Sequence, residues 1–104
     1  MANKGTVFVS GCFDILHGGH IEFLLSAKAL GDKLIVCVPT DDIFTKHKQR
    51  KPALSVEHRV ELIRALRMVD HVVVGNDPEP GLNFATQFLI MRPDILAVTE
   101  DDQY

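Results

Sequence analysis

The sequence predicts a single α/β domain built on a doubly wound, parallel β-sheet. Short apolar runs of the kind that form buried strands alternate with helix-periodic segments along the whole chain. Consecutive parallel strands need crossover connections, so this alternation favours strand–helix–strand units with helices on both faces of the sheet. The chain has 104 residues, 46% of them hydrophobic, which is the size of one domain, placed at residues 1–104. We therefore expect a Rossmann-like sheet that binds its ligand beyond the carboxyl ends of the strands.

The N-terminal part of the chain contains two strand candidates and one long helix. Gly5–Ser10 is almost continuously apolar, as expected for a strand that is covered on both faces. A helix is predicted over Gly18–Leu30, with Leu24 and Leu25 on its apolar face. Leu34–Val38 is predicted to be the second strand.

The rest of the chain adds a polar loop, two helices and two strands. Thr40–Pro52 is polar and basic, which predicts a loop, with a short helical turn near Asp41–Phe44 as an option. Ser55 is a suitable N-cap for a second helix, and the third helix is predicted to lie within 82–89. The third and fourth strands are predicted at His71–Val74 and Asp94–Val98.

The composition excludes several classes of partner. A net charge of −3 does not provide the basic surface of a general nucleic-acid-binding or membrane-binding protein. No apolar stretch approaches the roughly 20 residues that span a bilayer. Cys12 and Cys37 are not spaced as a C-x-x-C pair, and Met1–Gly5 lacks the pattern of a signal peptide. We therefore expect reduced thiols, a cytoplasmic location, and neither nucleic acid nor membrane as a partner.

The most informative segment is Gly11–His20, which reads G-C-F-D-I-L-H-G-G-H. It joins the first predicted strand to the first helix, where α/β domains direct backbone N–H groups toward a phosphate. His17 and His20 are three residues apart at the start of this helix, so both can reach the same phosphates. Gly18 and Gly19 allow the backbone to come close to the ligand. The segment differs from the dinucleotide-binding G-x-G-x-x-G and from the lysine-bearing P-loop.

This segment resembles the G-x-F-D-x-x-H-x-G-H signature of the nucleotidylyltransferase superfamily. The resemblance is strongest to its cytidylyltransferase-like branch, for example the glycerol-3-phosphate cytidylyltransferases. It implies transfer of a nucleotidyl group from a nucleoside triphosphate to a small phosphorylated alcohol or sugar, with release of pyrophosphate. It also implies Mg²⁺ as the cofactor, a homodimer, catalytic roles for His17 and His20, and an Asp14 that faces the metal. The nucleotide-binding residues that it implies here are Gly11, Cys12, Phe13, Asp14 and Gly19.

The residue types in the segment suit this reaction. A phosphomonoester has its second pKa near about 6, so at neutral pH it is already a dianionic nucleophile and needs no general base. The protein then has to align the attacking oxygen with the α-phosphorus and stabilise the charge that develops there. Imidazole N–H groups, cationic side chains and a helix N-terminus can provide that stabilisation.

The basic run Lys46–Lys51 supplies further candidates, because it follows a strand whose carboxyl end should face the site. In the family, lysines at this place reach the triphosphate, which implies a catalytic role for Lys48 and a nucleotide-binding role for Lys46. A small slip in register favours Arg50 instead. The E-H-R element that ends at Arg59 similarly implies that this arginine lies near the phosphates or the substrate.

The identity of the nucleotide rests on weaker features. The acidic pair Asp101 and Asp102 resembles residues that line the base or substrate pocket in cytidylyltransferases, and with Glu57–Arg59 it favours CTP. ATP is the alternative, because C-F-D-I-L-H also resembles the heptose 1-phosphate adenylyltransferases and the archaeal-type FAD synthetases. The family's R-T-x-G-x-S-T motif has no counterpart in these residues, so a short form of a longer enzyme and a nucleotide-binding subunit without turnover are both considered. A zinc-dependent interaction module is a further alternative, although no convincing set of four ligands supports it.

Overall fold

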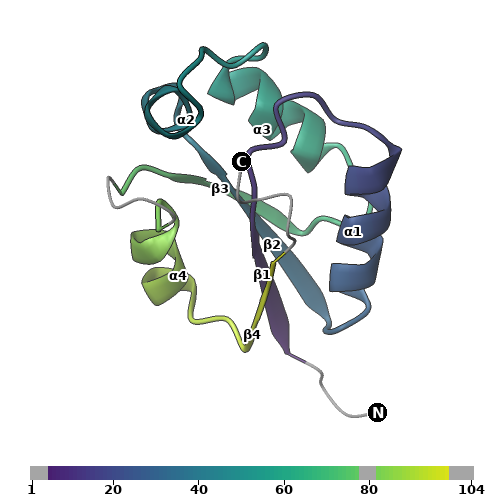
Figure 1. Cartoon of the computed structure of the whole chain (residues 1–104). Helices are drawn as coiled ribbons and strands as arrows, with labels where there is room; N and C mark the ends of the chain where they lie inside the picture. The colour runs from purple at the N-terminus through teal and green to yellow at the C-terminus, as the bar shows by residue number, and fades with distance from the viewer. Residues whose placement is uncertain (1–4, 78–81, 99–104) are drawn as a thin grey trace.

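The protein folds as a four-stranded parallel sheet flanked by helices. The structure, a computed structural model, describes residues 5–77 and 82–98. In chain order the elements are β1 (Thr6–Ser10), α1 (Gly18–Lys28), β2 (Lys33–Pro39), α2 (Asp41–Lys48), α3 (Val56–Arg64), β3 (His71–Gly75), α4 (Ala85–Met91) and β4 (Ile95–Ala97). The strands lie in the order β3-β2-β1-β4 and all pair in parallel (Figure 1). This order is that of the first four strands of a Rossmann fold, 3-2-1-4, and it confirms the predicted fold class.

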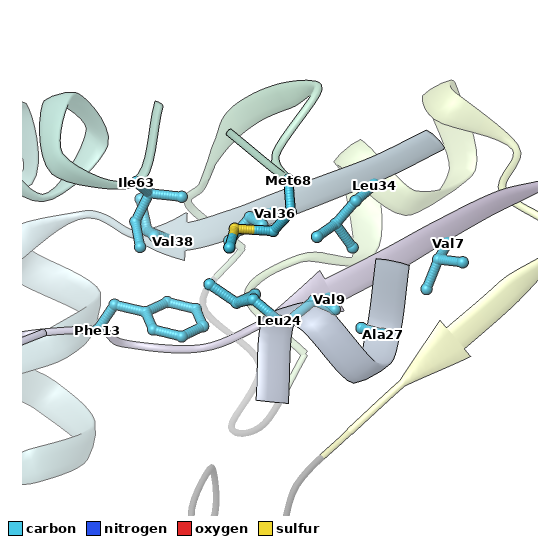
Figure 2. Close-up of a cluster of buried hydrophobic side chains, with 10 residues drawn as sticks. All are labelled: Val7, Val9, Phe13, Leu24, Ala27, Leu34, Val36, Val38, Ile63 and Met68. Atoms are coloured by element: carbon cyan, nitrogen blue, oxygen red, sulfur yellow. The ribbon is translucent and has the colours of Figure 1, made fainter. Parts of the chain in front are cut away.

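The central strand β1 separates two hydrophobic layers. Successive side chains of a strand point to opposite faces, so Val7 and Val9 contribute to one layer and Phe8 to the other. Figure 2 shows the first layer, in which residues of β1 and β2 pack against side chains from α1 and α3 such as Leu24 and Ile63. On the other face, the ring of Phe8 lies 5.4 Å from that of Phe88 on α4, centroid to centroid.

The helices cover both faces of the sheet, as the alternation of segments predicts (Figure 1). In α1, Leu24 and Ala27 are buried, whereas Leu25, which was predicted to lie on the apolar face, is 43% exposed. The helix also ends at Lys28 rather than at Leu30. Within the described part of the chain, no helix is long and apolar enough to cross a membrane.

The clearest departure from the sequence prediction is α2, an eight-residue helix in the segment that was predicted to be mainly a loop. The Oγ1 of Thr40 accepts a hydrogen bond from the N–H of Ile43 and caps the helix. Acidic residues occupy its first turn and basic residues its last turn, and both interact favourably with the helix dipole. Ile43 and Phe44 are buried and fasten the helix to the domain. The sequence prediction missed this helix because the segment is mostly charged. Its two apolar residues, Ile43 and Phe44, are adjacent and do not show a helical period.

Candidate active site

The signature segment forms the turn between β1 and α1, at the carboxyl end of the central strand. The N–H of Gly11 donates to the carbonyl oxygen of Cys37 at 3.1 Å, which keeps the turn attached to β2. Phe13 has a φ of 47°, a left-handed conformation that bulky residues rarely adopt. Its buried ring packs in the first hydrophobic layer and lies 5.2 Å from the His20 imidazole, centroid to centroid. This packing holds a strained backbone near the start of the turn, between β1 and the N-cap of α1.

Asp14 fastens this turn to the segment that follows α2. Its Oδ1 accepts a hydrogen bond from the N–H of Leu54 at 3.0 Å. Its Oδ2 accepts from the N–H of Ala53 at 3.0 Å and from Nη1 of Arg50 at 3.1 Å. Burial by itself raises the pKa of Asp14, but the two backbone N–H groups and the Arg50 guanidinium together lower this pKa below its ordinary value. Asp14 is therefore an ionised anchor between two loops.

His17 and His20 together build the N-terminus of α1. Nδ1 of His17, the N-cap residue, accepts a hydrogen bond from the N–H of Gly19 at 3.0 Å. Nδ1 of His20 accepts from the N–H of His17 at 3.2 Å, which completes a capping box made of two histidines. The two rings stack with their centroids 4.0 Å apart. A Cβ atom at position 19 would lie 2.9 Å from Cε1 of His17, so glycine is needed there for the ring to lie against the backbone.

The capping box determines what the two histidines can offer to a ligand. A neutral imidazole has one acceptor nitrogen and one N–H group. Since Nδ1 is the acceptor in both His17 and His20, the proton of each neutral ring is on Nε2. A second proton on Nδ1 would remove a capping hydrogen bond. The pair is therefore suited to donate hydrogen bonds to phosphate oxygens rather than to act as a general base.

A pocket of about 260 Å³ opens beside the histidines. Its walls come from the β1–α1 turn, from α1, and from α2 with the segment that follows it. The lining residues are Cys12, Phe13, Asp14, Ile15, His17, Gly19, His20, Phe23, Phe44, Lys48 and Arg50. The structure thus brings together at one pocket most of the residues of the signature that were predicted to form the site. Gly11 is buried directly after β1 and does not line the pocket.

Two cations of the basic run line the pocket, and they are Lys48 and Arg50. Lys48 is in the last turn of α2, and Gln49 then adopts a φ of 59° that ends the helix and redirects the chain. Lys46 is exposed on α2 and does not line the pocket. Arg50 was only the alternative in the sequence prediction. The helix-capping pattern of 40–48 was the signal that could have set the register.

Arg59 lies beneath the site, with its side chain fully buried. Its Nε donates to the carbonyl oxygen of Leu54 at 3.1 Å, and its Nη1 to that of Cys12 at 3.2 Å. Its Nη2 donates to Oδ1 of Asp41 at 2.8 Å. These contacts make Arg59 the link between the signature turn, the start of α2 and the segment before α3. It does not line the pocket that holds the histidines.

The described residues of the site do not by themselves form a metal-binding cluster. Among the described residues, no group of three or more histidine, cysteine, aspartate or glutamate side chains could hold a metal ion. Both carboxylate oxygens of Asp14, the predicted metal-facing residue, already accept hydrogen bonds from the protein. A Mg²⁺ ion at this site would therefore be held mainly by the phosphates of the nucleotide substrate.

The remaining candidates are the acidic pair and the cysteines. Asp101 and Asp102 lie outside the described residues. Cys37 is buried in β2, where burial and then the nearby charge of Asp77 raise the pKa of its thiol to about 12. Cys12 is partly exposed at the pocket. Cys37 is thus a core residue rather than a reactive group.

Comparisons with known proteins agree with the signature. A family model described as cytidylyltransferase-like matches residues 8–104. The FAD synthase of Pyrococcus abyssi is 45% identical over 98 residues, which cover 94% of this chain and 64% of that protein. The FAD synthase of Methanosarcina barkeri is 40% identical over 98 residues, which cover 94% of this chain and 66% of that protein. The chain thus spans slightly less than two thirds of the length of these relatives.

A solved structure supports the same relationship. The lipopolysaccharide core biosynthesis protein from Thermoplasma volcanium superposes with a TM-score of 0.83 at 31% identity, over 95% of this chain and 77% of its own. The shared fold, the family match and the signature at the end of β1 lead to one conclusion. The chain belongs to the cytidylyltransferase-like family of nucleotidylyltransferases.

Proposed function

We propose that this chain carries the nucleotide-binding core of an adenylyltransferase that joins ATP and flavin mononucleotide to form FAD. The type of reaction is inferred from the pocket at the N-terminus of α1. There two histidines with Nε2–H groups lie beside Lys48 and Arg50. The choice of substrates follows the relatives, which are FAD synthases at up to 45% identity. FAD is an adenylyl group joined to flavin mononucleotide through a pyrophosphate bond, so ATP and that flavin are its direct precursors.

In the proposed reaction, a phosphate oxygen of flavin mononucleotide attacks the α-phosphorus of ATP. The bond between the α-phosphorus and the bridging oxygen to the β-phosphate breaks, and pyrophosphate leaves with that electron pair. The attacking phosphate is a dianion at neutral pH, so no proton has to be removed from it. His17 and His20 donate Nε2–H hydrogen bonds to the oxygens on which charge develops, at the positive end of α1. Lys48 and Arg50 neutralise the β- and γ-phosphates, which Mg²⁺ accompanies as part of the substrate.

The relatives favour ATP over CTP, which was the nucleotide preferred from the sequence. That preference rested on Asp101, Asp102 and the E-H-R element ending at Arg59. Arg59 is engaged by three protein acceptors, and the acidic pair lies outside the described residues. These features therefore give little support to a cytosine-binding pocket, whereas the relatives with an adenylyl product are 40–45% identical to this chain.

Calorimetric titration of this chain with Mg·ATP and with Mg·CTP is the first test. Binding of Mg·ATP with at least tenfold preference over Mg·CTP is the expected result. The second test is incubation with Mg·ATP and flavin mononucleotide, followed by chromatographic detection of FAD and of pyrophosphate in equal amounts. Preference for CTP, or binding of neither nucleotide, would contradict the proposal.

A sugar phosphate is the second candidate acceptor, because one solved structural neighbour is a lipopolysaccharide core biosynthesis protein. Adenylyl transfer to either acceptor uses the same attack on the α-phosphorus, so the acceptor has to be tested directly. Pyrophosphate release with Mg·ATP and a sugar 1-phosphate, but not with flavin mononucleotide, would support this second candidate and overturn the first.

A further inference from the structure

The guanidinium groups of Arg50 and Arg59 both lie over the ring of Phe44. The Cζ atom of Arg50 is 5.0 Å from the centroid of this ring, and that of Arg59 is 5.4 Å from it. Both distances are within the range in which a cation is attracted to the face of an aromatic ring. Phe44 itself is 1% exposed, so the close packing around its ring restricts movement of the ring. The three side chains form one stack, which we call the Phe44 stack.

The buried end of the Phe44 stack is rigid. Arg59 is held by its three hydrogen bonds to Cys12, Leu54 and Asp41. Asp41 and Phe44 are three residues apart on α2, so Arg59 binds one and lies over the other on the same side of the helix. Arg59 therefore fixes the place of the Phe44 ring relative to the signature turn.

The exposed end of the Phe44 stack is Arg50, whose side chain is 58% exposed at the pocket. Its Nη1 donates hydrogen bonds to Oδ2 of Asp14 at 3.1 Å and to the carbonyl oxygen of Lys51 at 3.3 Å. Within residues 5–77 and 82–98, Nε and Nη2 of Arg50 donate to no protein acceptor. An exposed arginine normally samples many rotamers. Arg50 is restrained by the hydrogen bonds of its Nη1 and by the contact of its guanidinium with the Phe44 ring.

We infer that Phe44 is a positioning residue: it holds the Arg50 guanidinium beside the pocket so that Nε and Nη2 can bind a phosphate of the nucleotide. This inference rests on the proposed function for the identity of the ligand. A planar guanidinium that is already oriented loses less entropy on binding than a free one, and it can bind two phosphate oxygens at once. A lysine at position 50 would keep the charge but could neither stack in the same way nor present this fork.

The test combines a measurement without ligand and one with ligand, on Phe44→Leu, Arg50→Lys and the double variant. In the ligand-free protein, NMR should show an upfield ring-current shift of the Arg50 δ-methylene protons that Phe44→Leu removes. In calorimetry, Phe44→Leu should weaken Mg·ATP binding about 2- to 5-fold, the range expected for one cation–π contact. In the Arg50→Lys background the same substitution should have no further effect on affinity.

Two controls separate positioning from general destabilisation. Phe88→Leu makes the same change on α4, on the other face of the sheet, and should leave Mg·ATP affinity unchanged. If Phe44→Leu does not fold, Phe44→Met replaces the ring with another apolar side chain of similar length. The cycle is then measured with that variant.

The inference and the proposed function fail in different ways. If the wild-type chain binds no Mg·ATP, the proposed function is contradicted, whereas the ring-current shift of Arg50 still reports whether the Phe44 stack exists. If the wild type binds Mg·ATP and Phe44→Leu binds it equally well, the inference is overturned. An Arg50 with no ring-current shift, or a Phe44→Leu effect that persists in Arg50→Lys, would also overturn it.

Discussion

His17 caps α1, and in the proposed reaction it also binds the substrate; substitution by alanine would remove both roles together. Its Nδ1 accepts the capping hydrogen bond, which leaves Nε2 as the N–H donor of the neutral ring, and His17 lines the pocket. Asparagine at position 17 can still accept the N–H of Gly19 through its side-chain oxygen, but it is too short to place a donor where Nε2 lies. We expect His17→Asn to keep the free energy of unfolding close to that of the wild type and to lower the turnover of FAD synthesis by about 10²- to 10³-fold.

Chemical denaturation and steady-state kinetics of His17→Asn and His17→Ala test this separation. The alanine variant should lose about the same turnover and in addition about 1 kcal/mol of stability, because the cap is absent. An asparagine variant with wild-type turnover would show that Nε2 of His17 does not act on the substrate.

Asp14 links the acid stability of the domain to the integrity of its site. Its pKa is below the ordinary value of 3.8, so the folded state binds a proton at Asp14 less readily than the unfolded state does. The ionised carboxylate therefore stabilises the fold above this value, and the contribution is lost as the pH falls through the lowered pKa of the folded state. We expect the free energy of unfolding of the wild type to decrease from about pH 5 downward.

Asp14→Asn should be less stable than the wild type at pH 7, because an amide cannot accept hydrogen bonds at both ends of its side chain as the carboxylate does. The difference in free energy of unfolding between the two proteins should shrink as the pH is lowered. Urea denaturation at several pH values measures it. A difference that stays constant down to pH 3 would mean that Asp14 is not an ionised anchor.

The helix α2 shows how one element positions a site that lies in another. It begins directly after β2 and presents Lys48 to the pocket from its last turn. Its first turn is tied through Asp41 to the buried Arg59. The helix thus connects the interior beneath the signature turn with the rim of the pocket. Its orientation determines which side chains of the basic run Lys46–Lys51 face the pocket.

The register of α2 separates two lysines that the sequence treats alike. Lys48 lines the pocket, whereas Lys46 is exposed on the same helix. We expect Lys48→Ala to weaken Mg·ATP binding about tenfold or more, as for the loss of a charge-assisted hydrogen bond. Lys46→Ala changes the net charge by the same amount and should have a much smaller effect.

Calorimetry of both lysine variants at two salt concentrations checks this prediction. The small effect of Lys46→Ala should disappear at high salt, since it reflects only long-range attraction. Equal losses of affinity in the two variants would show that the end of α2 is arranged differently when the nucleotide is bound.

The fold as a whole could be predicted from local patterns, because each strand is a short apolar run and each crossover carries a helical period. β1, β2 and their parallel pairing follow from such runs. The histidine pair was also predictable, since His17 and His20 lie within one turn of one helix. The hydrogen bonds of Arg50 and Arg59 to the signature turn were not, because Arg50 and Asp14 are 36 residues apart in the chain and Arg59 and Cys12 are 47 apart. Sequence periodicity carries no information about contacts over that distance.

The central sheet allows the cooperativity of the whole domain to be measured through Cys37. This thiol is 0% exposed on β2, which is paired on both sides by β1 and β3, and its pKa is raised to about 12. A thiol reagent can therefore reach it only when the sheet opens. In a Cys12→Ser variant, where Cys37 is the one remaining cysteine, we expect the free energy derived from its labelling rate to equal the free energy of unfolding from urea denaturation.

Saturation with Mg·ATP at about 100 times its Kd should slow labelling about 100-fold, because the nucleotide binds only the folded state. Labelling that is much faster than global unfolding predicts, or that Mg·ATP leaves unchanged, would mean that β3 separates from β2 without the site being lost. The pocket and the β2–β3 edge would then be independent parts of the molecule.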